Sequence, residues 1–269
     1  MNVDADDPIR VTSEGAVATI WLNRPSKRNA MNYEMWASLH KRTSEVATDR
    51  SVRVVVLRGT GQHFCAGADI TELDVVRSSD GPSFAEVNSA AEAALATLAK
   101  PTIAYISGDC IGGGCALAID CDIRIATSDA RFGITPAKLG IVYPSASLER
   151  VTHLLGPAKT KRLLFTGELI SAGEALRIGL VDEVINIADG HERLATLADV
   201  LAARSLLTQA ATKSMVAEVA AHGLVRPNVQ DHWRTVAAGA PDAAEGIAAF
   251  VEKRSPRFTW SGPDSDQPE

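Results

Sequence analysis

The chain has 269 residues, with 27 Lys and Arg against 33 Asp and Glu, which gives a formal net charge of −6 at pH 7. Hydrophobic residues make up 46% and charged residues 22%, as in globular proteins with a sizeable core. The acidic balance argues against nucleic acid as the main partner, because phosphate binding needs a basic surface. No stretch approaches the ~18 apolar residues of a membrane span. The acidic first ten residues do not resemble a presequence, so we expect a cytoplasmic protein.

The cysteines lie at positions 65, 110, 115 and 121 and form no Cys-x-x-Cys pair. No histidine lies at zinc-ligand spacing from them, so we expect no metal site. Cys65 and Cys115 are interpreted as small reduced core residues rather than as nucleophiles.

Short strands alternate with helices along the first part of the chain. Ile9–Ser13 and Ala16–Leu22 predict a hairpin, because β-branched residues flank a Glu-Gly turn. Asn32 predicts the start of a helix that runs to Ala47, since asparagine is a favoured N-cap. Further strands are predicted at Val52–Leu57, Thr102–Ile106, Asp122–Ala126 and Leu180–Ile185. This alternation indicates an α/β fold with largely parallel strands.

Two segments between these strands carry local signals. Arg77–Ser83 is polar and broken by Gly-Pro, so it is either a flexible loop near a pocket mouth or a plain surface connection. An alanine-rich helix follows it and ends near Ala99. Ser171 and Glu174 match a capping box that opens a short helix ending at Gly179.

The last part of the chain predicts helices alone. After Ile187 the strand patterns cease, and helices are predicted at Glu192–Ala203, Leu206–Ala221, Val229–Ala238 and Asp242–Lys253. Their apolar side chains exceed what covering one domain needs, which indicates a subunit interface. These side chains are Leu206, Met215, Val216, Trp233, Ile247 and Phe250. Residues 262–269 are polar and contain two prolines, so we expect a disordered tail.

Two glycine-containing segments carry the functional signal. Phe64–Ile70 (Phe-Cys-Ala-Gly-Ala-Asp-Ile) and Ile111–Leu117 (Ile-Gly-Gly-Gly-Cys-Ala-Leu) each end an apolar run and open a predicted helix. The first amides of a helix are unpaired and lie at its positive end. Two such amides aimed at one point form an oxyanion hole. The pair resembles the signature of the crotonase (enoyl-CoA hydratase/isomerase) superfamily, and the resemblance extends from Ala16 to about Phe258.

The resemblance implies an α/β crotonase-type spiral of ββα units with an all-helical C-terminal oligomerisation region. Residues 1–200 would form the core that binds an acyl-CoA thioester, and residues 201–261 would build a homotrimer or a dimer of trimers. Residues 262–269 would form the tail. Coenzyme A belongs to the substrate, so no separate cofactor is expected.

The resemblance also assigns candidate site residues. The hole donors would be the amides of Ala68 and Gly113. In the segment Asn23–Ala30, Lys27 and Arg28 would meet the CoA phosphates, although a solvated basic turn is the alternative. The remaining positions expected to contact substrate or CoA are Ala30, Ala66, Asp69, Ile70, Gly112, Pro136, Leu139 and, from a neighbouring subunit, Lys253.

The chain departs from the family at two catalytic positions. A hydratase of this family uses two glutamates as general acids and bases. Aligning the glycine triplet places the first at Ala116, and aligning Phe132-Gly133 places the second at Pro136. Neither side chain can carry a proton, so the two-glutamate hydration mechanism is not expected here.

A third segment indicates a different reaction. Ile134–Tyr143 resembles the methylmalonyl-CoA decarboxylase branch, in which Thr-Pro and a later tyrosine mark the active-site wall, although that branch keeps a glutamate at the position of Ala116. Tyr143 is therefore either a proton donor or carboxylate partner, or a pocket-lining aromatic. Decarboxylation or a related lyase step is the leading prediction. The alternatives are a hydratase or isomerase that uses Glu72, Asp74 or Glu149, and a non-catalytic acyl-CoA-binding subunit.

Overall fold

A six-stranded sheet forms the centre of the molecule. The computed structural model describes residues 7–72 and 81–262. In spatial order the strands are β1 (Ile9–Glu14), β2 (Val17–Leu22), β3 (Val54–Gly59), β4 (Thr102–Ile106), β6 (Ile123–Thr127) and β9 (Glu183–Ile185). β1 and β2 pair antiparallel, and every other neighbouring pair is parallel. The predicted hairpin and parallel strands are confirmed, although β9 begins at Glu183 rather than at Leu180.

A second, smaller sheet contains strands that the sequence pattern did not predict. It has the order β5 (Asp109–Ile111), β7 (Arg131–Gly133) and β8 (Ile170–Ser171). Strands of two or three residues are too short for side-chain alternation to reveal them. β5 follows β4 after two residues and leads directly into helix α3 (Gly113–Asp120). The unit β4–β5–α3 therefore places one strand in each sheet before the helix, as in a ββα unit.

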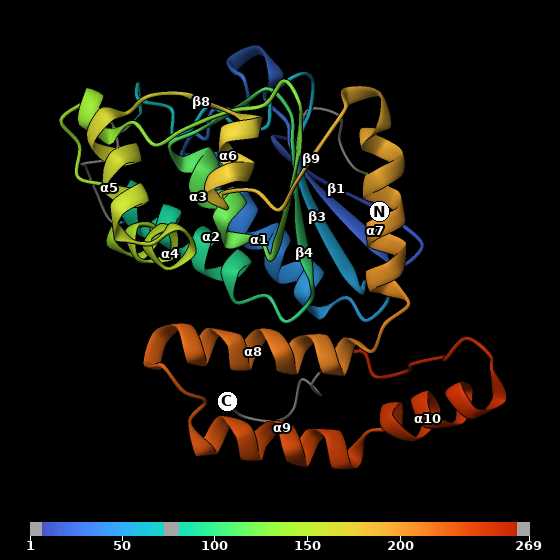
Figure 1. Ribbon diagram of the computed structural model, residues 1–269. Helices are drawn as coiled ribbons and strands as arrows, with labels where there is room; N and C mark the ends of the chain where they lie inside the picture. Colours follow the sequence, from blue (N-terminus) through green and yellow to red (C-terminus); the bar gives the residue numbers. More distant parts are fainter. Residues whose placement is uncertain (1–6, 73–80, 263–269) are drawn as a thin grey trace.

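Helices cover both faces of the large sheet (Figure 1). α1 (Tyr33–Thr48), α2 (Phe84–Ala96) and α3 lie on one face, and α7 (Gly190–Ala202) lies on the other, where Leu194 and Ala198 pack against β3 and β4. The side chain of Asn32 accepts a hydrogen bond from the amide of Met35, as the N-cap prediction requires. Ala47, where the predicted helix ends, is exposed, and α1 continues to Thr48. The buried stripe of α1 consists of Met35, Trp36, Leu39, Thr43 and Val46.

The remaining α-helices of the body lie between β7 and β9 in the chain. They are α4 (Ser145–Leu155), α5 (Pro157–Thr166) and α6 (Ala172–Ile178), and the short 3-10 helices are η1 (Pro25–Lys27), η2 (Pro136–Lys138) and η3 (Ile187–Asp189). Ser171 caps α6 by accepting from the amide of Glu174, and Gly179 ends it in the left-handed conformation, as predicted, but the Glu174 carboxylate pairs with Arg177 and does not complete the expected capping box. Ser83 and Glu86 form a capping box at the start of α2, which ends at Ala96 rather than near Ala99. Residues 77–80 of the predicted loop lie outside the described residues.

A separate layer of helices lies beneath the body (Figure 1). It consists of α8 (Leu206–His222), α9 (Pro227–Gly239) and α10 (Asp242–Glu252), in agreement with the predicted helices. Lys213 of α8 pairs with Asp122 of the body at 2.9 Å. Within the described ranges no helix combines the length and the apolar composition needed to cross a bilayer. Beyond residue 262 the predicted tail lies outside the described residues.

Candidate active site

The two glycine-containing segments lie side by side. Cys65 and Cys110 form a parallel bridge. The amide of Cys65 donates to the carbonyl of Asp109, and the amide of Ile111 donates to the carbonyl of Cys65, both at 2.9 Å. This pairing aligns the chain from Phe64 onward with β5 and brings the two expected donors to the same end of the pair.

The amides of Ala68 and Gly113 are free to receive a ligand. Met31 bridges to Ala68: its amide donates to the carbonyl of Gly67, and its carbonyl accepts from the amide of Asp69. In a parallel bridge this pattern turns the N–H of Ala68 itself away from Met31. Gly113 is the first residue of α3, so its amide has no partner within the helix. In the described part of the chain neither amide donates to a protein acceptor.

Glycine is required at two positions, Gly67 and Gly114, where these segments approach each other. A Cβ at Gly113 would lie 3.5 Å from the amide nitrogen of Ala68, so the two candidate donors are close neighbours. A Cβ at Gly114 would overlap the carbonyl oxygen of Cys65. Gly67 has φ of 102°, a conformation that other residues rarely adopt, and a Cβ there would lie 2.9 Å from the carbonyl oxygen of Ile111. The expected hole donors are therefore held by close main-chain packing.

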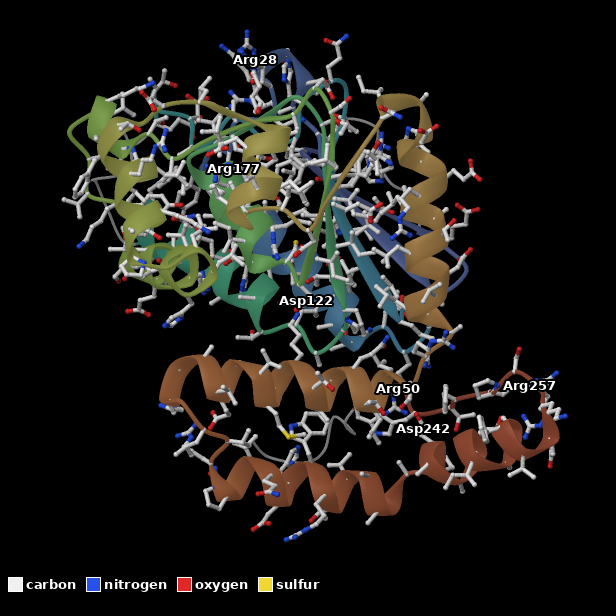
Figure 2. All side chains as sticks on the ribbon, in the orientation of Figure 1. Arg28, Arg50, Asp122, Arg177, Asp242 and Arg257 are labelled. Atoms are coloured by element: carbon white, nitrogen blue, oxygen red, sulfur yellow. The ribbon has the colours of Figure 1, made fainter. Side chains whose placement is uncertain are left out.

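The basic turn lies directly beside the first segment. Arg28 and Asn29 both have positive φ, and Asn29 fixes the turn by donating to the carbonyls of Thr60 and His63 at 3.0 and 2.7 Å. The amide of Ala66 donates to the carbonyl of Arg28. Lys27 and Arg28 are exposed, and Arg28 pairs with Asp109 at 3.1 Å. Figure 2 shows Arg28 at the edge of the body opposite the C-terminal helices.

Ala30, Asp69 and Ile70 surround this turn. The carbonyl of Ala30 accepts from Arg24, which also pairs with Asp69 at 2.7 Å. The Thr71 hydroxyl and the Arg24 guanidinium donate to Asp69 and lower its pKa to about 2. Asp69 therefore stays ionised and stabilises the turn, while Ile70 is exposed.

The three alternative acids differ in position. Glu72 accepts a hydrogen bond from the amide of Tyr33 at 3.1 Å, at the start of α1. Glu149 is exposed on α4. Asp74 lies outside the described residues. Among the described acids of this set, Glu72 lies close to the first hole segment. Its carboxylate already accepts a hydrogen bond at the start of α1.

Ala116, Pro136 and Leu139 belong to the elements that follow the hole. Ala116 is buried in α3, Pro136 begins η2, and Leu139 ends that turn half-exposed. The carbonyl of Gly112 accepts from the amide of Ala116, and the amide of Gly112 donates to the carbonyl of Gly133, which fixes the start of α3 beside β7 of the small sheet.

Tyr143 points inward from the segment that leads into α4. Its ring packs against the main core cluster, and its hydroxyl oxygen is buried without a hydrogen-bond partner in the described part of the chain. Burial raises the pKa of this phenol well above its usual value, and the nearby Cys115, Glu92 and Asp120 raise it further. These groups are therefore near enough to the phenol for their charges to act on it.

These acids belong to a buried polar cluster that the sequence analysis missed. Ser147 donates to Oε2 of Glu92 at 2.7 Å, and Nη1 of Arg150 lies 3.4 Å from the same oxygen and 2.9 Å from Oδ1 of Asp120. Asn88 donates to the other oxygen of Glu92. Burial, followed by the charge of Glu92, raises the pKa of Asp120 well above its usual value. The available signal was the position of Glu92 on the apolar stripe of α2.

The cysteines near the hole are buried free thiols. Burial raises the pKa of Cys65 to about 12, so its thiol is a poor nucleophile. Cys115 donates to the carbonyl of Cys110 at 2.9 Å. Their interpretation as core residues is confirmed.

Lys253 lies apart from this site. It ends α10 with φ of 55° and is exposed. α10 belongs to the lower layer, whereas Arg28 lies at the opposite edge of the body (Figures 1 and 2). The structure therefore does not bring Lys253 to the hole of its own chain.

Comparison with known proteins identifies the family. A model of the enoyl-CoA hydratase/isomerase family matches residues 12–261. The chain belongs to this family. It is 32% identical over 257 residues to a probable enoyl-CoA hydratase of Mycobacterium bovis, covering 94% of this chain and 98% of the relative. It is also 32% identical over 249 residues to the 2,3-dehydroadipyl-CoA hydratase of Escherichia coli, covering 92% and 97%.

Solved structures of the family have the same architecture. An enoyl-CoA hydratase/carnithine racemase from Magnetospirillum magneticum superimposes with a TM-score of 0.88 at 35% identity, covering 94% of this chain and 96% of that one. The prediction of a crotonase-type α/β fold with a helical C-terminal region is confirmed. Family membership makes the protein an enzyme that acts on CoA thioesters.

Proposed function

We propose that this enzyme binds the carbonyl oxygen of an acyl-CoA thioester at the amides of Ala68 and Gly113 and stabilises an enolate there, in a decarboxylation or related lyase step. The observation that carries the proposal is the convergence of two amides that have no acceptor within the described residues, together with the absence of an acid at the buried Ala116 and the half-buried Pro136. Each such donor contributes on the order of 3–4 kcal/mol to transition-state stabilisation. The reaction needs no cofactor beyond the CoA of the substrate.

Decarboxylation suits a hole that lacks a general base. When a 2-carboxyacyl thioester loses CO₂, the C–C bond breaks and its electron pair forms the enolate directly, so no proton is abstracted. The hole then stabilises the charge on the thioester oxygen. The α-carbon afterwards needs one proton, and the buried hydroxyl of Tyr143, which has no partner among the described residues, is our candidate donor.

Hydration is the second candidate, because several relatives carry the name of enoyl-CoA hydratases. The residues of this chain argue against an efficient form of it. Losing one general acid or base costs ~10²–10⁴-fold in rate, and two expected positions lack one. We therefore expect feeble hydration of crotonyl-CoA, and Ala116→Glu alone should restore little while Pro136 occupies the second position.

A panel of acyl-CoA thioesters tests the proposal. We expect turnover of a 2-carboxyacyl-CoA such as methylmalonyl-CoA, measured as CO₂ release, to exceed hydration of crotonyl-CoA measured by absorbance. Crotonyl-CoA hydration at roughly 10 s⁻¹, a typical enzyme turnover, would contradict the proposal and place the acid and base elsewhere. Tight binding of every thioester without turnover would instead indicate an acyl-CoA-binding subunit.

A further inference from the structure

A row of three side chains crosses the large sheet on the face that α7 covers. Trp21 of β2, Arg58 of β3 and Tyr105 of β4 are direct neighbours in the register of these parallel strands. The guanidinium carbon of Arg58 lies 4.6 Å from the centre of the Trp21 ring and 4.7 Å from that of Tyr105. Because the two rings come from opposite neighbouring strands, they flank the guanidinium. Ring contacts use its faces, so the N–H groups in its plane remain for other partners.

Arg58 lacks an acidic partner within the described residues. Its Nε is buried without a hydrogen-bond partner there, and its Nη1 lies 3.4 Å from Nδ1 of His191 at the start of α7. Burial lowers the pKa of the guanidinium, as expected for a cation that lacks a nearby counter-charge. A half-buried cation of this kind is costly to the protein unless an anion joins it.

A polar cavity of about 590 Å³ opens beside this guanidinium. His63, Arg131 and His191 line it together with Arg58. Nδ1 of His63 accepts a hydrogen bond from the amide of Asp109 at 3.0 Å, which places the ring proton on Nε2. Nδ1 of His191 can only accept from Arg58, because a guanidinium has no acceptor atom. Both Nε2–H groups therefore remain as donors, and neither has an acceptor in the described part of the chain.

The acids of this cavity are already engaged. Asp109 pairs with Arg131 at 2.6 Å and with Arg28 at 3.1 Å, so two guanidinium groups face one carboxylate. Asp129 is exposed and accepts from the hydroxyl of Thr127. Water screens an exposed charge of this kind more strongly than a buried one. With the unpaired guanidinium described above, three such cations face two carboxylates, and the cavity carries a positive balance.

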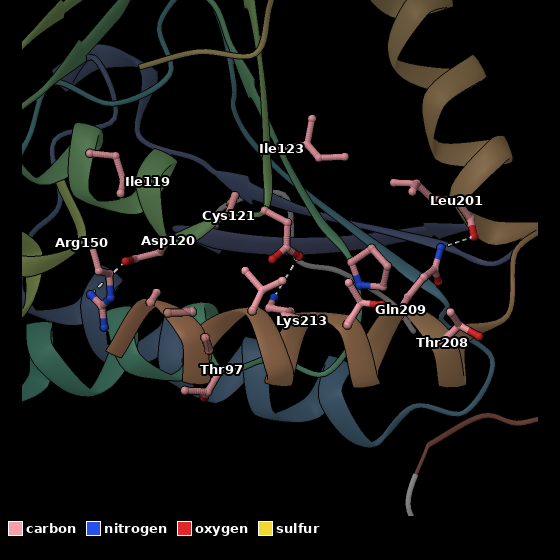
Figure 3. A pocket seen from close by; sticks show the side chains of 17 residues that line it. Thr97, Ile119, Asp120, Cys121, Ile123, Arg150, Leu201, Thr208, Gln209 and Lys213 are labelled. Carbon is pink, nitrogen blue, oxygen red and sulfur yellow. Dashed lines mark hydrogen bonds and ion pairs between the residues drawn. The ribbon is translucent and has the colours of Figure 1, made fainter. Parts of the chain in front are cut away.

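The cavity beneath the body differs in this respect. It has a volume of about 700 Å³ and lies between the body and α8 (Figure 3). The cations in its described wall are each paired with an acid, Arg150 with Asp120 and Lys213 with Asp122, both at 2.9 Å. An anion that entered this space would compete with a carboxylate for each positive charge. At Arg58 it would meet a cation without one.

We propose that the cavity at Arg58 binds the phosphoryl group of a small phosphate ester. Arg58 and the Nε2–H groups of His63 and His191 would donate to its oxygens. A tetrahedral dianion accepts hydrogen bonds from several directions, which suits donors from β3, α7 and the loop after β3. The organic part has room, because an adjoining groove of about 860 Å³ shares Arg58 and His191 and includes Trp21 in its wall. Neither hole donor lines the cavity, so this site is separate from the candidate active site.

Isothermal titration calorimetry with AMP tests this site, with excess CoA present to occupy the substrate site. We expect AMP to bind, and Arg58→Gln to weaken its binding roughly tenfold or more, as for the loss of a hydrogen bond to a charged group. Arg177→Gln is the matched control, because this exposed guanidinium on α6 pairs with Glu174. It should keep the wild-type affinity. Equal affinities in the two variants, or no binding of AMP to the wild type, would overturn the proposal.

A second variant separates a lost donor from a folding defect. His191 is exposed on α7, so His191→Ala should keep the wild-type melting temperature and still weaken AMP binding, by roughly threefold or more. Unchanged AMP affinity in this variant would overturn the proposed site. Inorganic phosphate, titrated under the same conditions, should bind more weakly than AMP because it leaves the adjoining groove empty. An affinity for inorganic phosphate equal to that for AMP would overturn the assignment of an ester.

Discussion

Gly113 shows how little space a side chain has beside the candidate hole. The built Cβ at this residue lies 3.5 Å from the amide nitrogen of Ala68 and 3.4 Å from the ring of Trp36. The contact with the ring is ordinary, and φ at Gly113 is not in the left-handed region. A methyl group there would therefore leave the fold intact and occupy the space where a thioester oxygen would lie.

We predict that Gly113→Ala lowers kcat by about 10²–10³-fold, the usual loss when an oxyanion-hole donor is denied its ligand, with little change in melting temperature. Gly173→Ala in α6 is the control, because its Cβ would meet only the Ser171 hydroxyl at 4.0 Å. Steady-state kinetics and thermal melts of both variants check the prediction. Full activity in Gly113→Ala would remove this amide from the site.

Tyr143 differs from the other tyrosines in having a buried hydroxyl without a described partner. If that hydroxyl donates the proton, Tyr143→Phe should lower kcat by ~10²–10⁴-fold and leave KM nearly unchanged, because the ring area is kept. Tyr33→Phe is the control, since its hydroxyl bonds to the carbonyl of Pro82 at the surface. Decarboxylation kinetics that match the wild type would make Tyr143 a pocket-lining aromatic.

Asp120 gives the folding stability a pH dependence of known sign. Its pKa in the folded protein is raised above the ordinary value of 3.8, so the unfolded chain loses this proton first as the pH rises. The contribution of Asp120 to the folding stability is therefore greatest below pH 3.8, and it declines as the pH rises to the pKa of the folded protein. We predict that the melting temperature of Asp120→Asn, relative to the wild type, is higher at about pH 8 than at about pH 4. An identical difference at both pH values would contradict the raised pKa.

At the scale of elements, long periodic segments were predictable and short ones were not. The four C-terminal helices and the hairpin follow from hydrophobic periodicity and turn residues, and the N-cap of α1 follows from Asn32. β5, β7 and β8 are too short to carry a period, and α4 and α5 lie in a stretch for which the sequence pattern predicted no helix. The candidate donors were predictable from two local motifs, whereas Glu92 and Asp120 meet only through the packing of α2, α3 and α4.

The capping box of α2 yields a prediction for this element. The hydroxyl of Ser83 accepts from the amide of Glu86, and the carboxylate of Glu86 accepts from the amide of Ser83 at 2.7 Å. Ser83→Ala should lower the free energy of unfolding by ~1 kcal/mol, the usual value of an N-cap. Ser44→Ala, inside α1, is the control and should not destabilise, because alanine is the better helix former. Urea denaturation measures the free energy of unfolding of both variants, and an equal change in the two would contradict the prediction.

At the scale of the whole molecule, the lower helical layer exposes large apolar side chains. Val216, Ile247, Phe250 and Val251 are 61%, 68%, 85% and 73% exposed. Leu206, the first residue of α8, was expected at a subunit interface. It is instead buried within its own chain. Exposed apolar faces of this kind typically mark interfaces between subunits.

We predict a homotrimer or a dimer of trimers assembled through this layer, and light scattering at micromolar concentration measures its mass. Replacing both Ile247 and Phe250 by Asp should dissociate it, because charged side chains are costly to bury. Ile187→Asp, an exposed apolar site on η3 in the body, is the control and should leave the mass unchanged. A monomer mass for the wild type would end this prediction.

The candidate hole consists of main-chain groups held by the contact between the Phe64–Ile70 segment and β5, and this has a consequence for how such an enzyme changes over time. Any point mutation at Ala116, Pro136 or Tyr143 replaces the side chain, whereas at Ala68 or Gly113 only a change to proline removes the N–H. Substitutions at these three side chains can therefore alter which bond is broken while activation of the thioester is retained. An engineer who starts from this chain inherits the polarising device and needs to redesign only the proton-transfer groups around it.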